Sequence, residues 1–328
     1  MKNNKETIKQ LKYIVGDRYI ITAKWSKVPY SEGWRYGSGK AFAVIKPGTL
    51  LEIWDILKVC VDNNIIVIMQ AANTGLTGGS TPYGNDYDRP VIIINTLRIK
   101  DIHIINEGRQ IIGLSGSTLY GLERKLKPFD REPHSIIGST SIGASIIGGI
   151  FNNSGGSLVK RGPAYTQLAL YAKVNKNGKL ELVNDLGINL GSKPEEILNN
   201  LQNVNYKKSD IVNSDKLASD DKYSEIVRQI NSKTPARFNA DKRLLYGASG
   251  SAGKIIVFAV RLDTYPKPKK SRVFYVGSNK PNTFWKIRRD ILSKFKTLPT
   301  LGDYLLSLIH ISEPTRRTPI SYAVFCLK

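Results

Sequence analysis

Two stretches rich in glycine and hydroxyl side chains have the composition of loops that bind phosphate groups. The first runs from Ala71 to Ser80 and contains three glycines, two threonines and a serine. It follows the apolar run 65–70, which is typical of a buried strand. Glycine allows the backbone to approach a ligand closely, and successive N–H groups can turn inward around an anion. The loop could therefore hold a diphosphate, although a single cluster of this kind is more often an ordinary turn.

A second stretch of the same kind makes a shared binding site the better interpretation. It covers residues 138–156 and ends in the sequence Asn-Asn-Ser-Gly-Gly. Its small residues and interspersed aliphatic residues indicate a loop, a helix and another loop packed beneath a ligand. Close packing of a helix in a core would explain Gly148 and Gly149, but not the run from Asn152 to Gly156.

Other kinds of site have less support. Residues 247–255 resemble a nucleotide P-loop, but the spacing is one residue too long, and Ile255 stands where a Ser or Thr would hold magnesium. No Gly-x-Gly-x-x-Gly pattern opens a helix in a βαβ unit, so a Rossmann nicotinamide site is not expected. The three histidines, His103, His134 and His310, show no metal-ligand spacing, and two cysteines imply no disulfide framework.

The elements around the first loop follow a β-α-β order. Residues 41–45 have the pattern of a buried strand, and Thr49 with Glu52 forms a capping box that opens a helix ending near Asp62. The strand 65–70 completes a βαβ unit, for which parallel strands and a right-handed crossover are expected. The loop would thus lie at the carboxyl end of a strand, where open α/β sheets usually bind ligands.

The rest of the chain predicts a mixture of helices and hairpins. Helical patterns cover residues 5–14, 117–127 and 194–202. Strand patterns cover residues 91–94, 101–105, 110–114, 166–174, 179–183 and 254–262. The polar stretch 203–224 has the composition of a surface insertion.

Composition narrows the classes of function. The chain has 328 residues, is 41% hydrophobic and carries a net charge of +22, so it is globular and strongly basic. No zinc-finger spacing or RNP-like motif accompanies the charge, so we expect no nucleic acid partner. Residues 267–296 hold ten Lys or Arg against one acid, which suits either a solvated face or contact with an anionic surface. The polar N-terminus lacks the apolar core of a secretory signal, and no apolar run approaches the ~20 residues that span a bilayer.

Several motifs, taken in order, resemble one family. They are the run Gln70 to Pro82, the sequence Arg-Glu-Pro-His-Ser at 131–135, the sequence Asn-Asn-Ser-Gly-Gly-Ser at 152–157, and Arg-Gly-Pro at 161–163. Together they closely resemble the respiratory, quinone-dependent D-lactate dehydrogenases, which belong to the vanillyl-alcohol-oxidase type of FAD proteins. The likeness extends from near the N-terminus to about Tyr304.

The resemblance implies an α+β fold: an FAD-binding domain of the p-cresol methylhydroxylase type, with one mostly parallel and one mostly antiparallel subdomain. It also implies a set of cofactor-binding positions: Ala71, Ala72, Asn73, Thr74, Gly75, Gly79, Ser80, Gly138, Ser145, Gly155 and Val257. The first loop has no His or Cys for a covalent link, so we expect FAD to bind non-covalently. His134 could lie near the flavin, but a structural hydrogen-bonding role is at least as plausible, so we assign it no catalytic role.

The implied reaction is oxidation of D-lactate to pyruvate, with electrons passing to a membrane quinone. The implied place is the cytoplasmic side of the inner membrane, as a peripheral protein on an anionic surface. Another FAD oxidoreductase of the same type, such as a glycolate oxidase subunit, is the alternative, and a basic binding protein without redox activity is a third. The catalytic base and the carboxylate-binding residues are not identifiable.

The resemblance also suggests how the chain is divided. We expect an FAD-binding domain at 1–265 and the start of the substrate-cap and membrane-associated region at 266–305. Residues 306–316 resemble a translated sequencing-library adapter, so we expect 306–328 to be artefactual, with no strand or helix joining it to the fold. Because the family's chain is longer, we expect this one to bind FAD without turning over D-lactate.

Overall fold

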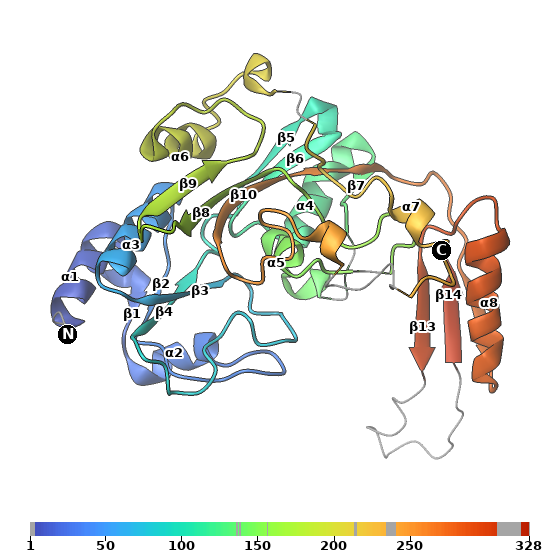
Figure 1. Ribbon diagram of the computed structural model, residues 1–328, viewed down its shortest axis with the longest axis horizontal. Coiled ribbons are helices and arrows are strands. Elements are labelled where there is room, and N and C mark those ends of the chain that lie inside the picture. Colours follow the sequence, from blue (N-terminus) through green and yellow to red (C-terminus); the bar gives the residue numbers. More distant parts are fainter. Residues whose placement is uncertain are drawn as a thin grey trace.

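The computed structural model describes residues 4–135, 137, 139–155, 157–212, 215–233, 241–306 and 323–327. Two large sheets lie side by side, with helices on their outer faces, and a smaller sheet with one long helix lies at the far end of the molecule (Figure 1). The mixture of one mostly parallel and one antiparallel sheet confirms the predicted α+β class.

The first sheet is mostly parallel and has the strand order β1-β2-β4-β3. Strands β2 and β3 both run parallel to β4, and β1 lies antiparallel at the edge. The predicted βαβ unit is therefore present, but its two strands are separated by β4 instead of lying next to each other. The elements of this part are α1 (Asn4–Val15), β1 (Ile20–Ile21), α2 (Lys24–Ser31), β2 (Ala43–Ile45), α3 (Leu50–Asp62), β3 (Ile66–Gln70) and β4 (Val91–Asn95).

The second sheet is antiparallel throughout and has the order β5-β6-β10-β8-β9. The last of its strands in the sequence, β10, lies at the centre. Its elements and neighbours are β5 (Ile102–Ile105), β6 (Gln110–Leu114), α4 (Leu119–Leu126), β7 (Arg131–Glu132), α5 (Ile146–Phe151), β8 (Ala169–Val174), β9 (Leu180–Asn184), α6 (Pro194–Gln202), α7 (Tyr223–Ile226), β10 (Ile256–Asp263) and β11 (Tyr265–Pro266).

One apolar core joins the two sheets. It includes Ile53 and Ile56 of α3, Ile92 of β4, and Leu114 and Leu170 of the second sheet, all with no exposed surface. Burial of this many aliphatic side chains is the main term that favours folding. Helix α3 is held at its start as the capping box predicts, because Thr49 Oγ1 accepts a hydrogen bond from the backbone N–H of Glu52 at 3.1 Å.

The third sheet corrects two expectations. It has the order β12-β14-β13, and α8 lies against it (Figure 1). Its elements are β12 (Phe274–Ser278), α8 (Pro281–Lys294), β13 (Gly302–Leu306) and β14 (Ala323–Leu327). The expectation of no strand after residue 306 is wrong, since β14 pairs with both β12 and β13. Helix α8 was not predicted, because the basic run in which it lies hides its apolar positions.

The stretch 203–224 is more than a surface insertion. The side chain of Tyr223 has no exposed surface and packs with Val159, Val227 and Leu292. Its ring lies so close to Gly162 that a Cβ atom there would come within 2.5 Å of it. The polar composition of the segment conceals this buried aromatic anchor.

Candidate functional site

The first glycine-rich stretch is a loop held at both ends by one buried amide. Gln70, the last residue of β3, is 3% exposed, and its Nε2 donates hydrogen bonds to the carbonyls of Tyr30 and Ser80, both at 2.8 Å. Asn95, at the end of β4, donates from Nδ2 to the carbonyl of Ala71 at 3.0 Å. The ends of two neighbouring parallel strands therefore fix where the loop begins and where it closes.

Asn73 shapes the inside of this loop. Its backbone has a φ of 54°, a left-handed conformation that asparagine tolerates better than most residues. Its Nδ2 donates to the carbonyl of Glu32 at 2.6 Å. Gly78 also has a positive φ, 74°, so this position demands glycine for conformational reasons.

At three of the predicted glycine positions, neither backbone conformation nor packing explains why the residue is glycine. A Cβ atom placed on Gly75, Gly79 or Gly155 would meet no atom of the described residues within 4 Å, and none of these glycines has a positive φ. Neither backbone strain nor close packing against the chain therefore explains glycine at these positions. Open space in front of a glycine backbone fits a ligand that approaches the main chain closely.

The two glycine-rich stretches meet in space. A Cβ atom on Gly143 would lie 3.3 Å from the Cβ of Ala72. Two residues later, Ser145 begins α5, and its Oγ accepts a hydrogen bond from the N–H of Gly148 at 3.0 Å. A Cβ atom on Gly148 would come within 2.8 Å of that oxygen, so glycine leaves room for the cap.

Val257 belongs to the apolar core beside the second glycine-rich stretch. Its side chain is 1% exposed and belongs to the apolar cluster that also contains Ala144, Ile146 and Ile150. It pairs with Tyr171 of β8, and the register shifts at the next residue, which is a β-bulge. Because its side chain is buried in this cluster, the side chain is not available to a ligand. Gly138, another predicted position, lies outside the described residues.

Several buried polar atoms near these stretches have no hydrogen-bond partner within the described part of the chain. They are Ser115 Oγ, His134 Nδ1, Ser135 Oγ and Ser251 Oγ. Leaving a buried polar group unpaired costs about 1–3 kcal/mol, so such groups call for an explanation.

His134 is the most unusual of these groups. Its side chain is buried, and burial together with the neighbouring charge of Arg161 lowers the pKa of its imidazole from 6.5 to about 4. Arg161 donates to the carbonyl of Pro133 at 2.9 Å and pairs with the carboxylate of Glu132, while its guanidinium stacks on the Tyr265 ring. The imidazole is therefore neutral near pH 7. Its Nδ1 has no hydrogen-bond partner among the residues that the structure describes.

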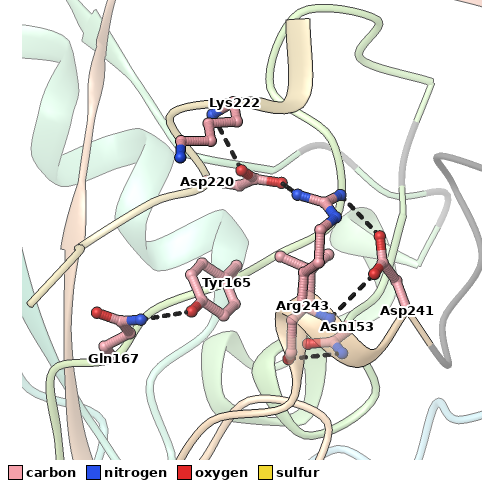
Figure 2. Close-up of polar contacts among 8 residues, drawn as sticks. Asn153, Tyr165, Gln167, Asp220, Lys222, Asp241 and Arg243 are labelled. Atoms are coloured by element: carbon pink, nitrogen blue, oxygen red, sulfur yellow. Dashed lines mark hydrogen bonds and ion pairs between the residues drawn. The ribbon is translucent and has the colours of Figure 1, made fainter. Parts of the chain in front are cut away.

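An ionic network of one exposed arginine and two buried carboxylates braces the end of the second stretch (Figure 2). Arg243 lies between two carboxylates: its Nη2 donates to Asp241 at 2.7 Å, and its Nη1 is 3.7 Å from Asp220. Asn153, which has a φ of 42°, donates from Nδ2 to the carbonyl of Leu244 at 3.1 Å. The network thus holds the turn after α5 against residues 241–244.

The segment 247–253 was excluded as a P-loop, and the structure agrees, because the strand β10 follows it instead of a helix. The place of this segment next to α5 was nevertheless not predicted from the sequence. The N–H groups of Gly250 and Ala252 donate to the carbonyls of Ile150 and Phe151, at 3.0 and 3.2 Å, so the segment packs on the end of α5. Its three glycines all have a positive φ. Since glycine is the residue that adopts this conformation most readily, they are the feature of the sequence that could have identified an ordered loop here.

Comparison with known proteins shows which proteins this chain resembles. Residues 41–184 match the family of FAD binding domains, and residues 273–315 match the family described as D-lactate dehydrogenase, membrane binding. Among solved structures, an alkyldihydroxyacetonephosphate synthase has a TM-score of 0.65 at 12% identity and covers 99% of this chain and 57% of its own. The p-cresol methylhydroxylase structure with substrate bound has a TM-score of 0.58 at 12% identity and covers 100% of this chain and 61% of its own. The fold is that of the p-cresol methylhydroxylase type of FAD-binding proteins.

The curated relatives are more specific and confirm the resemblance seen in the sequence. The chain is 57% identical to the quinone-dependent D-lactate dehydrogenase of Haemophilus influenzae over 92% of its length, and 52% identical to that of Escherichia coli over 92%. The enzyme of the same name from Corynebacterium glutamicum is 50% identical, again over 92%. The chain spans about half the length of these relatives, 53%, 53% and 52% respectively.

Two further observations bear on the surroundings of the protein. The match to the membrane-binding family begins at residue 273 and extends to 315, beyond the point at which the family likeness was expected to stop. Among the described residues, no helix is both long and apolar enough to cross a bilayer.

Proposed function

We propose that this chain is the FAD-binding part of a D-lactate dehydrogenase that delivers electrons to a membrane quinone. What carries the proposal is identity of 50–57% to three quinone-dependent D-lactate dehydrogenases over 92% of the chain. The cofactor-binding geometry supports it, because the glycine-rich stretches of this sequence lie together and present open backbone.

In this proposal the two stretches hold the diphosphate and the adjoining parts of FAD. Gly75 and Gly79 let the main chain approach the phosphate oxygens, and Asn73 and Ser80 keep the loop in shape. Ser145 and Gly155 flank α5 on the opposite side, with Val257 contributing its backbone. Backbone N–H groups in such loops are well suited to a doubly charged diphosphate.

The proposed reaction converts D-lactate to pyruvate by loss of two electrons and two protons, which a quinone takes up to become a quinol. FAD, when bound, supplies the redox centre between the two. The contribution of this chain is to bind and orient that group and to keep water from it. No base is assigned among the described residues.

Residues 267–296 are proposed to face the membrane. Ten Lys or Arg side chains lie in this segment, and Phe274, Tyr275, Trp285 and Phe295 are each more than half exposed. Exposed aromatic rings among cations are typical of surfaces that rest in the interface of an anionic bilayer. Contact of this kind is peripheral, and we place it on the cytoplasmic side of the inner membrane. The domain limits 1–265 and 266–305 are part of the same proposal.

The experiment that tests the function uses the purified chain and a complete relative. The chain should be yellow, with a flavin absorption spectrum, and a colourless protein that takes up no added FAD would contradict the proposal. The complete relative should be bleached by D-lactate under anaerobic conditions but not by L-lactate or glycolate, and should recover its colour on addition of a quinone. Bleaching by glycolate alone would favour a glycolate oxidase instead.

A further inference from the structure

A cavity of about 660 Å³ lies along the outer edge of the second sheet, and none of the residues that line it belongs to the two glycine-rich stretches. All six residues from Asp101 to Asn106, which include the whole of β5, line one side of it. The other lining residues are Lys125 of α4, Gln202 at the end of α6, and Asn203, Val204, Tyr206, Lys207, Lys208 and Ile211 beyond it. The cavity is therefore an elongated groove whose floor is an edge strand.

The register of β5 shows which of its backbone groups face the groove. Leu114 donates from its N–H to the carbonyl of Asp101 at 3.1 Å, which makes these two residues a hydrogen-bonded pair. By alternation, His103 and Ile105 direct their N–H and C=O groups toward β6, and Ile102 and Ile104 direct theirs outward. Lys125 agrees with this assignment, since its Nζ donates to the outward carbonyl of Ile102 at 2.8 Å.

The walls of the groove are positively charged and partly aromatic. Lys125, Lys207 and Lys208 line it together with a single acid, Asp101. On one face, Tyr206 is bonded to the ring of His103, with Nδ1 and the hydroxyl 2.9 Å apart, which fixes both rings at the rim. Outward backbone groups, neighbouring side-chain walls and an excess of cations are the features by which an extended, acidic peptide is recognised on a sheet edge.

We propose that this groove binds an extended acidic peptide segment, which adds as a strand antiparallel or parallel to β5. The outward N–H and C=O groups of Ile104 pair with the peptide backbone. Acidic side chains of the peptide meet Lys125, Lys207 and Lys208, and its alternate apolar side chains lie against Ile104 and Val204. A phosphate or carboxylate ion would bind to the lysines but would not pair with the backbone of β5. Variants of the lysines and of β5 therefore distinguish such an ion from a peptide.

The test measures fluorescence anisotropy of a labelled, end-blocked peptide of four Glu-Val repeats against the full chain at low salt. Saturable binding is expected, and a peptide of Lys-Val repeats should bind at least about tenfold more weakly because it opposes the three lysines. Inorganic phosphate at the same concentration should not displace the peptide. Displacement by phosphate would show a small-anion site, and absence of saturable binding would refute the groove as a docking surface.

Two variants separate charge from strand addition. Lys207→Glu combined with Lys208→Glu should weaken binding about tenfold or more, whereas the matched pair Lys9→Glu and Lys176→Glu, both exposed and distant, should have little effect. Ile104→Pro removes the outward N–H while sparing the bonds to β6, as edge strands tolerate. It should weaken binding to a similar degree, and Ile104→Val should not.

Hydrogen exchange keeps the proposal testable if Ile104→Pro fails to fold. In the unaltered chain, exchange at the Ile104 amide should slow when the Glu-Val peptide is added, and exchange at the His103 amide should change little because it already faces β6. An unchanged rate at Ile104, or equal binding by the Lys207→Glu and Lys208→Glu variant, would overturn the proposal.

Discussion

Ser80 and Asn73 close the glycine-rich loop upon itself: the Ser80 hydroxyl donates to Asn73 Oδ1 across 2.7 Å. Asn73 is bonded in turn to Glu32, and Ser80 to Gln70, so the loop is attached to two other segments. A loop fixed in this way before the ligand arrives loses little conformational freedom on binding. The geometry around Gly75 and Gly79 therefore belongs to the protein alone and can be probed by mutation.

Replacement of Gly79 by valine should abolish FAD binding without unfolding the chain. The added side chain has room in the free protein, because no protein atom lies within 4 Å of its Cβ position, but it would occupy the space that the phosphates need. Flavin content after purification should fall by at least about tenfold, while the far-UV circular dichroism stays native. Gly277→Val is the matched control, since Gly277 also faces open space and has no positive φ but lies in β12. Equal flavin content in both variants would show that the loop is not at the cofactor.

FAD should be released completely when the protein is denatured by acid. The described residues near the loops offer no cysteine, and Cys60 is buried in α3, where burial raises the pKa of its thiol to about 12. His134 lies outside the first loop, and its side chain is buried. After acid precipitation the supernatant should contain all the flavin. Yellow colour that stays in the pellet would show a covalent bond.

His134 should make the apoprotein less stable as the pH falls. The pKa of its imidazole is about 4 in the folded chain and 6.5 in the reference state. Between pH 6.5 and pH 4, the unfolded chain therefore binds a proton that the folded chain does not bind. The free energy of unfolding should be constant above this window and decrease through it, by about 3 kcal/mol at most. Urea unfolding at pH 7 and pH 5 measures the effect. In His134→Gln, the difference in the free energy of unfolding between pH 7 and pH 5 should be smaller by about 2 kcal/mol. An unchanged difference would show that the pKa of His134 is not lowered in the folded chain.

Charge reversal on α8 should weaken contact with anionic membranes. Lys286→Glu with Arg288→Glu removes two cations beside the exposed Trp285, and each basic residue near such a surface contributes about 1 kcal/mol. Sedimentation with phosphatidylserine vesicles should therefore fall by about tenfold or more, and added salt should weaken binding of the unaltered chain. Lys9→Glu with Lys176→Glu provides the control for net charge. Vesicle binding that responds equally to both pairs would indicate a diffuse effect of charge rather than a defined face.

The sequence predicts well those elements whose signal is local. Helix α3 begins where Thr49 caps it, although Glu52 reaches back to the N–H of Gly48, at 2.6 Å, instead of to Thr49 itself. Strand β4 is recognisable because Val91 to Ile94 are buried on both faces. The hairpin of β8 and β9 is recognisable because its turn residues lie between two alternating runs.

What the sequence does not show depends on contacts between distant residues. Nothing local indicates that Arg243 lies between Asp220 and Asp241, or that β4 separates β2 from β3. The position of Gly143 beside Ala72 likewise requires the fold, since 71 residues separate them in the chain. The sequence predicts that the two loops share a site, but only the folded chain shows that Gly143 of one lies against Ala72 of the other.

The central place of β10 determines the order in which the molecule can be completed. Strand β10 fills the gap between β6 and β8, yet it is made last, at residues Ile256–Asp263. During synthesis β6 and β8 must therefore wait with open edges while the ribosome adds the residues in between. Pairings this distant in sequence form slowly and leave strands available for wrong partners. The second half of the domain should thus depend on chaperones far more than the first, whose sheet is complete once Asn95 has emerged.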